Sequence, residues 1–378
     1  MSIILFVFSA TLIIYTLVGY PLILAIAACF WPKPVEKRRL QKSVSIIIPT
    51  HNGARFVAGK LESVLALRYP HFLMDILVVS DGSTDETESI VERFASQGVR
   101  LLSIPRGGKC MALNAGISHS TNEILVLTDV RQKLAPDSLQ ALIGCFADPS
   151  VGVVSGNLLI RQGASSDEVS TGLYWRYENW IRRNLSSLDS IFGATGPFYA
   201  MRRELTVPLP QDILLDDMYL PLACFFRGYR LIVESRAEAF DYPTSREIEF
   251  KRKVRTLAGN YQILRAYPAL LGPRNRMWFH FMSHKVSRLM LPWIVALLFV
   301  SSWFLPTPFR SITLGAQAAF YGVAALDPYI PTIFPLKSLS SVARTFLALL
   351  LAAVWGLSVF FRPPRSLWKE TTIGAHHP

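Results

Sequence analysis

The chain has 378 residues, of which 51% are hydrophobic, 12% aromatic and 17% charged, and its formal net charge is +12. This apolar character, together with only four cysteines, excludes a disordered protein and a small disulfide-stabilised scaffold. It indicates instead that part of the chain lies in lipid, while the positive charge suits nucleic acid, anionic lipid or a polyanionic small substrate.

The first 32 residues contain no charged side chain. About 20 residues at about 1.5 Å each cross a hydrocarbon core of about 30 Å, so this segment predicts a transmembrane helix. A basic cluster follows the apolar run instead of preceding it, which favours a retained helix over a signal peptide. The cluster comprises Lys33, Lys37, Arg38, Arg39 and Lys42. By the positive-inside rule, the residues after it are expected in the cytoplasm, beside the anionic leaflet of a cell inner (plasma) membrane.

Between residues 44 and 147, short apolar runs alternate with helical patterns. Strands are predicted at 44–48, 75–80, 99–103 and 123–128, and helices near 54–67, 84–96, 108–117 and 136–147. Each strand is continuously apolar rather than alternating, which is typical of a sheet covered on both faces. The pattern predicts an α/β domain with a largely parallel sheet.

Polar residues follow each predicted strand, at the edge where such sheets bind ligands. In chain order they are Pro49 to Asn52, Asp81 to Asp85, Arg106 to Lys109, and Asp129 with Arg131. Structural explanations exist for them, since residues 83–86 read as a helix capping box and the glycines suit turns. Neither a Walker A loop nor a dinucleotide GxGxxG is present. The loops therefore predict another kind of nucleotide site, with acids for ribose, base or a divalent ion and cations for a diphosphate.

Three further apolar stretches lie at 289–309, 311–336 and 345–361. Asp327 and Pro328 interrupt the middle stretch, which is expected to be re-entrant or interfacial, because that would leave the basic tail (Arg362, Arg365 and Lys369) inside. Asp327 is read as a turn residue, with a functional intramembrane acid as the alternative. An aromatic and arginine-rich segment at 174–183 reads either as a membrane-surface helix or as core packing.

The expected organisation has four parts. They are a transmembrane helix (1–32), a cytoplasmic domain with interfacial helices at its C-terminal end (33–288), a transmembrane region of about three segments (289–361) and a tail (362–378).

The loop sequences PTHN (49–52), VVSDGSTDET (78–87), RGGKCMALNAG (106–116) and LTDVR (127–131) resemble, in order and spacing, the nucleotide-binding half of family 2 glycosyltransferases. This is the inverting GT-A group that includes cellulose and hyaluronan synthases. Further along, FGATGPFYAMRR (192–203) resembles the acceptor loop, LLDDMYLPL (214–222) the catalytic motif and FKRKVRTLAGN (250–260) the last family motif. The resemblance implies a GT-A fold flanked by membrane helices.

For the donor, the resemblance implies that Asp81 contacts the nucleotide base, expected to be uracil, and that Pro49, His51 and Asn52 line the same pocket. Lys109 would lie near the phosphates. Asp129 matches the first acid of the DxD motif, which binds the sugar nucleotide and its Mg²⁺ or Mn²⁺ ion. Arg131 stands at the second acidic position. A metal held by two close carboxylates is therefore in doubt, and Arg131 would itself face the diphosphate.

For the acceptor, the resemblance implies that Asp217 is the general base and that Thr195, Gly196 and Asp216 bind the acceptor. A sugar hydroxyl is a weak nucleophile and needs a carboxylate within about 2.6–3.2 Å to take its proton. Arg252 and Arg255 share a helical face and would stabilise the leaving diphosphate, unless they form a solvated or lipid-facing stripe. Thr256 replaces the tryptophan of the last family motif, which weakens the case for a long processive product.

The resemblance implies a membrane-bound inverting glycosyltransferase that moves a sugar from a nucleotide-sugar, expected to be a UDP-sugar, to a lipid-linked or growing glycan acceptor in cell-surface polysaccharide synthesis. One alternative is a processive exopolysaccharide synthase with a secretion path, for which the chain would have to form a homo-oligomer. The other is a catalytically silent membrane scaffold of the same fold. Membrane lipids are expected partners, and nucleic acid is not, because the basic clusters flank apolar segments.

Overall fold

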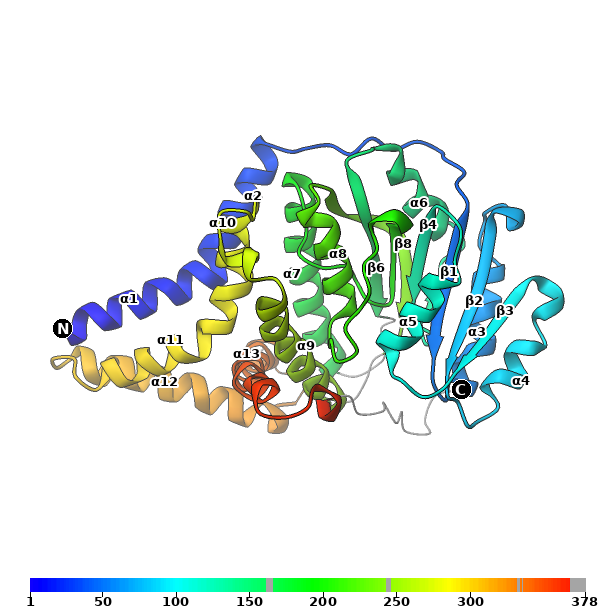
Figure 1. Ribbon diagram of the computed structural model, residues 1–378. Coiled ribbons are helices and arrows are strands. Elements are labelled where there is room, and N and C mark those ends of the chain that lie inside the picture. Colours follow the sequence, from blue (N-terminus) through cyan, green and yellow to red (C-terminus); the bar gives the residue numbers. More distant parts are fainter. Residues whose placement is uncertain (161–165, 243–245, 332–333, 335, 368–378) are drawn as a thin grey trace. The chain divides into compact units, whose positions relative to one another are not determined.

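The computed structural model describes residues 1–160, 166–242, 246–331, 334 and 336–367 (Figure 1). The chain divides into two compact units. Residues Phe30–Gln162 and Arg182–Pro243 form one, here called the sheet unit. Residues Met1–Cys29, Gly163–Ile181 and Thr244–Pro378 form the other, here called the helical unit.

The sheet unit is built on one eight-stranded sheet in the order β3-β2-β1-β4-β7-β6-β8-β5. The strands are β1 (Val44–Thr50), β2 (Met74–Asp81), β3 (Val99–Ile104), β4 (Ile124–Thr128), β5 (Lys133–Leu134), β6 (Val151–Ile160), β7 (Phe198–Arg202) and β8 (Arg230–Asp241). Strands β3, β2, β1 and β4 are parallel, whereas β7 is antiparallel to both β4 and β6. The predicted α/β class is confirmed, with a mixed sheet whose parallel half carries all four predicted strands.

The helices of this unit are α3 (Ala54–Leu65), α4 (Thr87–Glu92), α5 (Lys109–Ser118), α6 (Ser138–Gly144), α8 (Asp216–Phe226) and the last part of α7 (Ser166–Leu188). The helix expected at 84–96 is much shorter, and the capping-box reading of residues 83–86 is wrong. Glu86 precedes α4 without a side-chain cap. The Asp85 carboxylate instead accepts hydrogen bonds from the backbone N–H groups of Thr87 (3.1 Å) and Ala54 (3.0 Å), so it ties together the loops after β1 and β2.

The core lies on both faces of the parallel strands, as their continuous apolar sequences predict. Ile46, Ile47 and Ile48 are all fully buried, and burying one such side chain stabilises a fold by about 1.5–3 kcal/mol. Helix α5 lies so close to the sheet that a Cβ on Gly116 would be 2.5 Å from a methyl carbon of Ile47. This close approach holds α5, which begins at Lys109, against the sheet.

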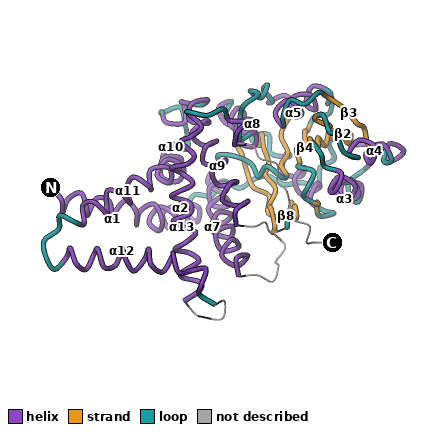
Figure 2. The backbone as a smooth tube through the Cα atoms, turned by 90° about the horizontal axis from the view of Figure 1, so that it is seen from below, coloured by secondary structure: helices purple, strands orange, loops and turns teal. Residues whose placement is uncertain are grey.

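The helical unit consists of α1 (Ser2–Ile14), α2 (Tyr20–Phe30), α9 (Arg246–Ala266), α10 (Trp278–Phe281), α11 (Ser287–Ser302), α12 (Phe309–Leu326), α13 (Leu336–Gly356) and the first part of α7. Helices α1 and α11 run side by side (Figure 2). Within the described residues, three helical stretches are long and apolar enough to cross a membrane. They are Ser2–Phe30, Trp278–Ser302 and Leu336–Phe360.

The middle apolar stretch, predicted not to cross fully, contains α12, which is not among these three. Helix α12 ends at Leu326, and Asp327 begins a short turn, as predicted. The stretch expected from residue 345 begins earlier, at Leu336, because a buried Asp327 compensates the polar start of α13. The Asp327 carboxylate lies 3.1 Å from Lys337 Nζ and 3.2 Å from an Arg344 guanidinium nitrogen. Lys369 lies outside the described residues.

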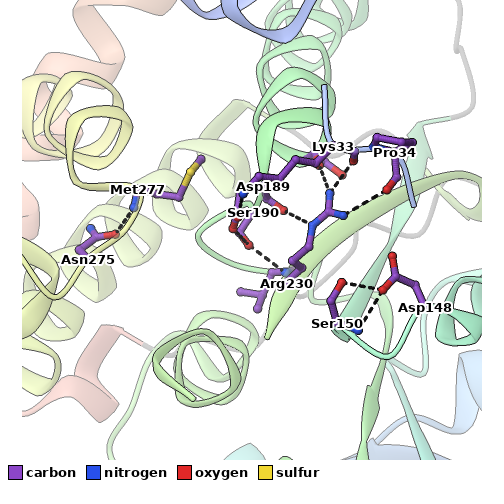
Figure 3. Close-up of polar contacts among 11 residues, drawn as sticks. Lys33, Pro34, Asp148, Ser150, Asp189, Ser190, Arg230, Asn275 and Met277 are labelled. Carbon is purple, nitrogen blue, oxygen red and sulfur yellow. Dashed lines mark hydrogen bonds and ion pairs between the residues drawn. The ribbon is translucent and has the colours of Figure 1, made fainter. Parts of the chain in front are cut away.

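Residues 32–43 connect the first helical stretch to β1, and their charges pair within the sheet unit. Lys33 Nζ lies 2.9 Å from Asp189, and Lys37 Nζ lies 2.6 Å from Glu234. The Arg230 guanidinium donates to the carbonyl oxygens of Lys33 (2.8 Å) and Asp189 (3.1 Å) (Figure 3). Lysines expected to face an anionic leaflet are thus in part neutralised by acids of the sheet unit.

Candidate active site

Asp81, the last residue of β2, organises the glycine loop. Its carboxylate accepts hydrogen bonds from the backbone N–H groups of Gly107 (2.6 Å) and Gly108 (2.9 Å), and it pairs with Arg106. Gly82 has a φ of +59°, and a Cβ there would lie 2.8 Å from the backbone nitrogen of Arg106. Only glycine fits that position, so Asp81 and Gly82 together hold the glycine loop against the end of β2.

The loop after β1 meets the same edge. His51 Nδ1 lies 2.8 Å from the carbonyl oxygen of Asp81. Asn52 has a φ of +48°, and its side-chain oxygen accepts a hydrogen bond of 2.9 Å from the backbone N–H of Thr84. The four residues expected to surround the nucleotide base, Pro49, His51, Asn52 and Asp81, therefore belong to two adjacent strand ends that are hydrogen-bonded to each other. Their contact with a base stays a prediction.

Lys109, the first residue of α5, joins two carboxylates from distant parts of the chain. Its Nζ lies 3.0 Å from Asp129 Oδ1, at the end of β4, and 3.3 Å from Asp216 Oδ1, at the beginning of α8. Burial alone would lower the pKa of Lys109, but the charges of Asp129, Asp216 and Asp217 outweigh burial and raise the pKa. The ammonium group therefore stays protonated and holds these acids together.

Asp216 and Asp217 occupy the first turn of α8, where the positive end of the helix dipole favours carboxylates. The expected acceptor loop packs directly on Asp217. The backbone N–H of Ala194 donates to the Asp217 carbonyl oxygen at 2.7 Å. A Cβ on Gly196 would lie 2.8 Å from Asp217 Oδ2. The loop and the predicted general base are therefore in contact.

Thr195, which is expected to bind the acceptor, is hydrogen-bonded to Ser155 of β6. Its backbone N–H donates to Ser155 Oγ at 2.9 Å. The Arg182 guanidinium donates to the hydroxyl oxygens of both Ser155 (2.9 Å) and Thr195 (3.2 Å). These bonds give the loop that is expected to bind the acceptor a defined conformation.

Arg131 is directed towards an acid that the sequence reasoning missed. Its guanidinium pairs with Asp241, the last residue of β8, and Asp241 also accepts a hydrogen bond of 2.9 Å from Gln132 Nε2. Asp241 is 3% exposed. The alternation of Ala237, Ala239 and Asp241 on one buried face of β8 is the signal that would have revealed it. The role of Arg131 at a diphosphate stays a prediction.

Lys60 on α3 was also missed. It is 1% exposed, and its Nζ donates to Thr128 Oγ1 (2.6 Å) and to the carbonyl oxygen of Gln132 (2.7 Å). The sequence signal is its position on the apolar face of α3, beside Val57, Leu61 and Val64.

In the segment from Asp129 to Arg131, only Asp129 carries a carboxylate that could bind a divalent cation. Among the described residues, no group of three or more His, Cys, Asp or Glu side chains has the arrangement of a metal site. Mg²⁺ in proteins is often held by one or two carboxylates together with waters and substrate phosphates. The residues present therefore fit a cation shared between Asp129 and a bound diphosphate, and not a site made by protein ligands alone.

Arg252 and Arg255 lie on α9 in the helical unit. Arg252 lies 3.9 Å from Glu249 on the same helix. Their expected role at the leaving diphosphate stays a prediction.

Comparison with known proteins gives a family-model match and several similar proteins. Residues 45–207 match the family model described as Glycosyl transferase family 2. The chain is 26% identical over 247 residues to the poly-beta-1,6-N-acetyl-D-glucosamine synthase of Staphylococcus epidermidis, covering 61% of this chain and 60% of that relative. It is 20% identical over 365 residues to the beta-monoglucosyldiacylglycerol synthase of Synechocystis sp., covering 88% of this chain and 75% of that relative.

Among solved structures, the chain resembles a mannosyltransferase from Pyrobaculum calidifontis in complex with GDP-Man and Mn²⁺. The TM-score is 0.70 and the identity 23%, over 93% of this chain and 99% of that one. This similarity confirms the expected GT-A fold.

Proposed function

We propose that this chain, whose residues 45–207 match the Glycosyl transferase family 2 model, is a membrane-bound inverting enzyme that transfers a sugar from a nucleotide-sugar to an acceptor hydroxyl. The observation that carries this proposal is the position of Lys109. It joins Asp129, at the end of a parallel strand where ligands bind, to Asp216, the neighbour of Asp217. Donor-binding and proton-accepting groups of the expected kinds therefore meet at one edge of the sheet.

In the proposed reaction, Asp217 accepts the proton of the acceptor hydroxyl as its oxygen attacks the anomeric carbon. The new bond forms on the face opposite the leaving group, so the configuration inverts. The bond between the anomeric carbon and the phosphate oxygen breaks, and its electron pair leaves with the nucleoside diphosphate. The contact between Gly196 and Asp217 supports this role, because the loop expected to bind the acceptor lies against Asp217.

On the donor side, Lys109 and Asp129 would bind and orient the diphosphate end of the nucleotide-sugar. A bound Mg²⁺ or Mn²⁺ would neutralise negative charge on the diphosphate. Asp81 would act through the glycine loop, whose backbone N–H groups it holds, and Pro49, His51 and Asn52 would line the base pocket. We expect a UDP-sugar, with a GDP-sugar as the donor to test beside it.

We propose that the acceptor is lipid-linked or a growing glycan and that the protein resides in the plasma membrane with the sheet unit in the cytoplasm. The three apolar helical stretches found among the described residues support the membrane location. The names of the two relatives support acceptors of both kinds, since one is a diacylglycerol glycoside synthase and the other a polysaccharide synthase. The second relative makes a processive synthase the second candidate, and the length of the product distinguishes the two.

The test uses the full chain in detergent or nanodiscs with UDP- and GDP-sugars, and measures nucleotide release and nucleotide binding separately. Asp217→Asn should lower turnover by about 10²–10⁴-fold while nucleotide binding stays within twofold. Asp212→Asn, which changes an exposed acid five residues earlier, is the matched control and should keep full turnover. Equal turnover in Asp217→Asn would remove Asp217 from its role. Absence of binding and turnover with every donor would favour the silent scaffold.

A further inference from the structure

Lys60 is a buried cation in the core of the sheet unit that the proposed mechanism does not use. It is 1% exposed, and the apolar residues Val57, Leu61 and Val64 on the same helix are fully buried. A buried ammonium group normally needs a carboxylate partner, because leaving water is costly for a charge. Within the part of the chain that the structure describes, no carboxylate forms an ion pair with Lys60, and both of its hydrogen-bond partners are uncharged.

The two partners lie on either side of the short loop that carries Asp129 and Arg131. Thr128 Oγ1, before the loop, accepts one hydrogen bond of 2.6 Å, and the carbonyl oxygen of Gln132, after it, accepts the other of 2.7 Å. The ammonium group of Lys60 therefore closes this turn from the inside of the protein. Its charge also lies close enough to Asp129 to interact with it electrostatically.

Thr128 also connects Lys60 to the loop that is expected to bind the acceptor. While Thr128 Oγ1 accepts from Lys60, it donates to the carbonyl oxygen of Pro197 at 2.7 Å. The backbone N–H of Asp129 reaches the same carbonyl oxygen at 3.3 Å. Pro197 follows Gly196, which lies against Asp217. Lys60 thus connects the donor-side loop with the loop that contacts the proposed base.

We propose that Lys60 is a positioning residue for the sugar transfer: its ammonium group holds the turn from Thr128 to Gln132 so that Asp129 is presented to the diphosphate of the donor. This inference rests on the proposed function. It concerns the donor step, so a change at Lys60 should alter donor binding more than acceptor binding.

The energetics agree with a positioning role. Burial lowers the pKa of Lys60 to about 7, with the charge of Asp129 acting in the opposite direction. Burial of the charged amine therefore lowers the free energy of unfolding, compared with an apolar side chain of similar length at this position. A side chain that does not favour the fold, and whose hydrogen bonds all go to one functional loop, is best explained by what it does for that loop.

The test compares Lys60→Met with Lys133→Met in the full chain. Lys133 is exposed, follows Gln132 directly, and makes a matched control. In Lys60→Met, we expect the dissociation constant for the nucleoside diphosphate, measured in the presence of Mn²⁺, to rise about tenfold. The KM for the donor should rise by a similar factor, and the KM for the acceptor should stay unchanged. The melting temperature should stay the same or rise. Lys133→Met should resemble the wild type in every measurement.

A purely structural role would show the opposite pattern, a lower melting temperature with donor binding within twofold, and that pattern would overturn the proposal. If Lys60→Met does not fold, Thr128→Val decides, because it removes the hydroxyl through which Lys60 is connected to the Thr128–Gln132 turn and to the carbonyl oxygen of Pro197. It should weaken nucleotide binding in the same direction, and unchanged binding would overturn the proposal. Nucleotide binding is measured without any acceptor. Failure of the Lys60 proposal therefore remains distinguishable from failure of the transfer reaction.

Discussion

Substitution of Gly196 by alanine tests whether the acceptor loop and Asp217 act together. The new Cβ would lie 2.8 Å from Asp217 Oδ2, whereas ordinary van der Waals contact begins at 3.4 Å. The carboxylate oxygen must therefore move by about 0.6 Å. A proton acceptor works within about 2.6–3.2 Å of its donor, so a shift of that size spans the whole useful range.

We expect Gly196→Ala to lower kcat by about 10- to 100-fold, since a misplacement of about 1 Å costs about 100-fold in rate. The dissociation constant for the nucleotide should stay within twofold, because the displaced carboxylate lies on the acceptor side. Overpacking of this kind destabilises a fold by about 1–3 kcal/mol, which a thermal unfolding curve in detergent would show as a modest decrease. The activity assay is nucleotide release at saturating donor with the acceptor varied.

Gly193→Ala is the matched control in the same loop. Its Cβ would lie 3.2 Å from Met218 Cγ and 3.4 Å from the backbone oxygen of Asp217, and its three nearest atoms include no carboxylate oxygen. Its kcat should fall by less than about threefold, on the order of 0.6 kcal/mol in the barrier. Equal losses in the two variants would refute a specific contact with Asp217, and an unchanged kcat in Gly196→Ala would refute Asp217 as the base.

Three further measurements follow from the structure. The pKa of Lys60 falls from its ordinary 10.5 to about 7 on folding, so the unfolded chain binds more protons between these values. The free energy of unfolding of the wild type, relative to Lys60→Met, should therefore rise with pH from about 7 to 10, by at most about 5 kcal/mol, and a flat difference would contradict the burial. Tyr199→Phe removes a buried hydroxyl with no hydrogen-bond partner in the described protein, so thermal unfolding should show unchanged or slightly higher stability, and a loss above about 1 kcal/mol would indicate a bridging water. Gly356→Ala would bring a Cβ within 2.9 Å of the Ala258 backbone nitrogen, so the melting temperature in detergent should fall by the equivalent of about 1–3 kcal/mol, whereas Gly315→Ala, with open space around it, should not lower it.

The sequence was sufficient for the parallel half of the sheet and for the polar loops that follow it. Continuous apolar runs mark the buried strands β1 to β4, and parallel strands bring their carboxyl ends to one edge. That reasoning placed Asp81, Lys109 and Asp129 at a common edge before any contact was known. The motif resemblance added Asp217, which no periodicity would have selected.

The features that the sequence did not predict depend on contacts between residues far apart in the chain. Arg131 pairs with Asp241, 110 residues later, and only the position of β8 in the sheet brings them together. Lys60 lies on an apolar helix face, but no local pattern shows that a cation there finds two oxygen atoms of another loop. The beginning of α13 was misplaced for a similar reason, because Lys337 and Arg344 look too polar for an apolar helix until Asp327 is placed beside them.

The pairing of Asp327 with Lys337 and Arg344 has a consequence for biogenesis. Ser340 and Ser341 donate further hydrogen bonds of 2.8 and 2.9 Å to the same carboxylate, so the acid and the two cations form one compensated group. A lone α13 would carry Lys337 and Arg344 without their acidic partner, and a cation at the centre of a membrane helix costs about 2.5–3.5 kcal/mol on insertion scales. We therefore expect α13 to integrate into the bilayer less efficiently in Asp327→Ala than in the wild type, as measured in a glycosylation-mapping assay.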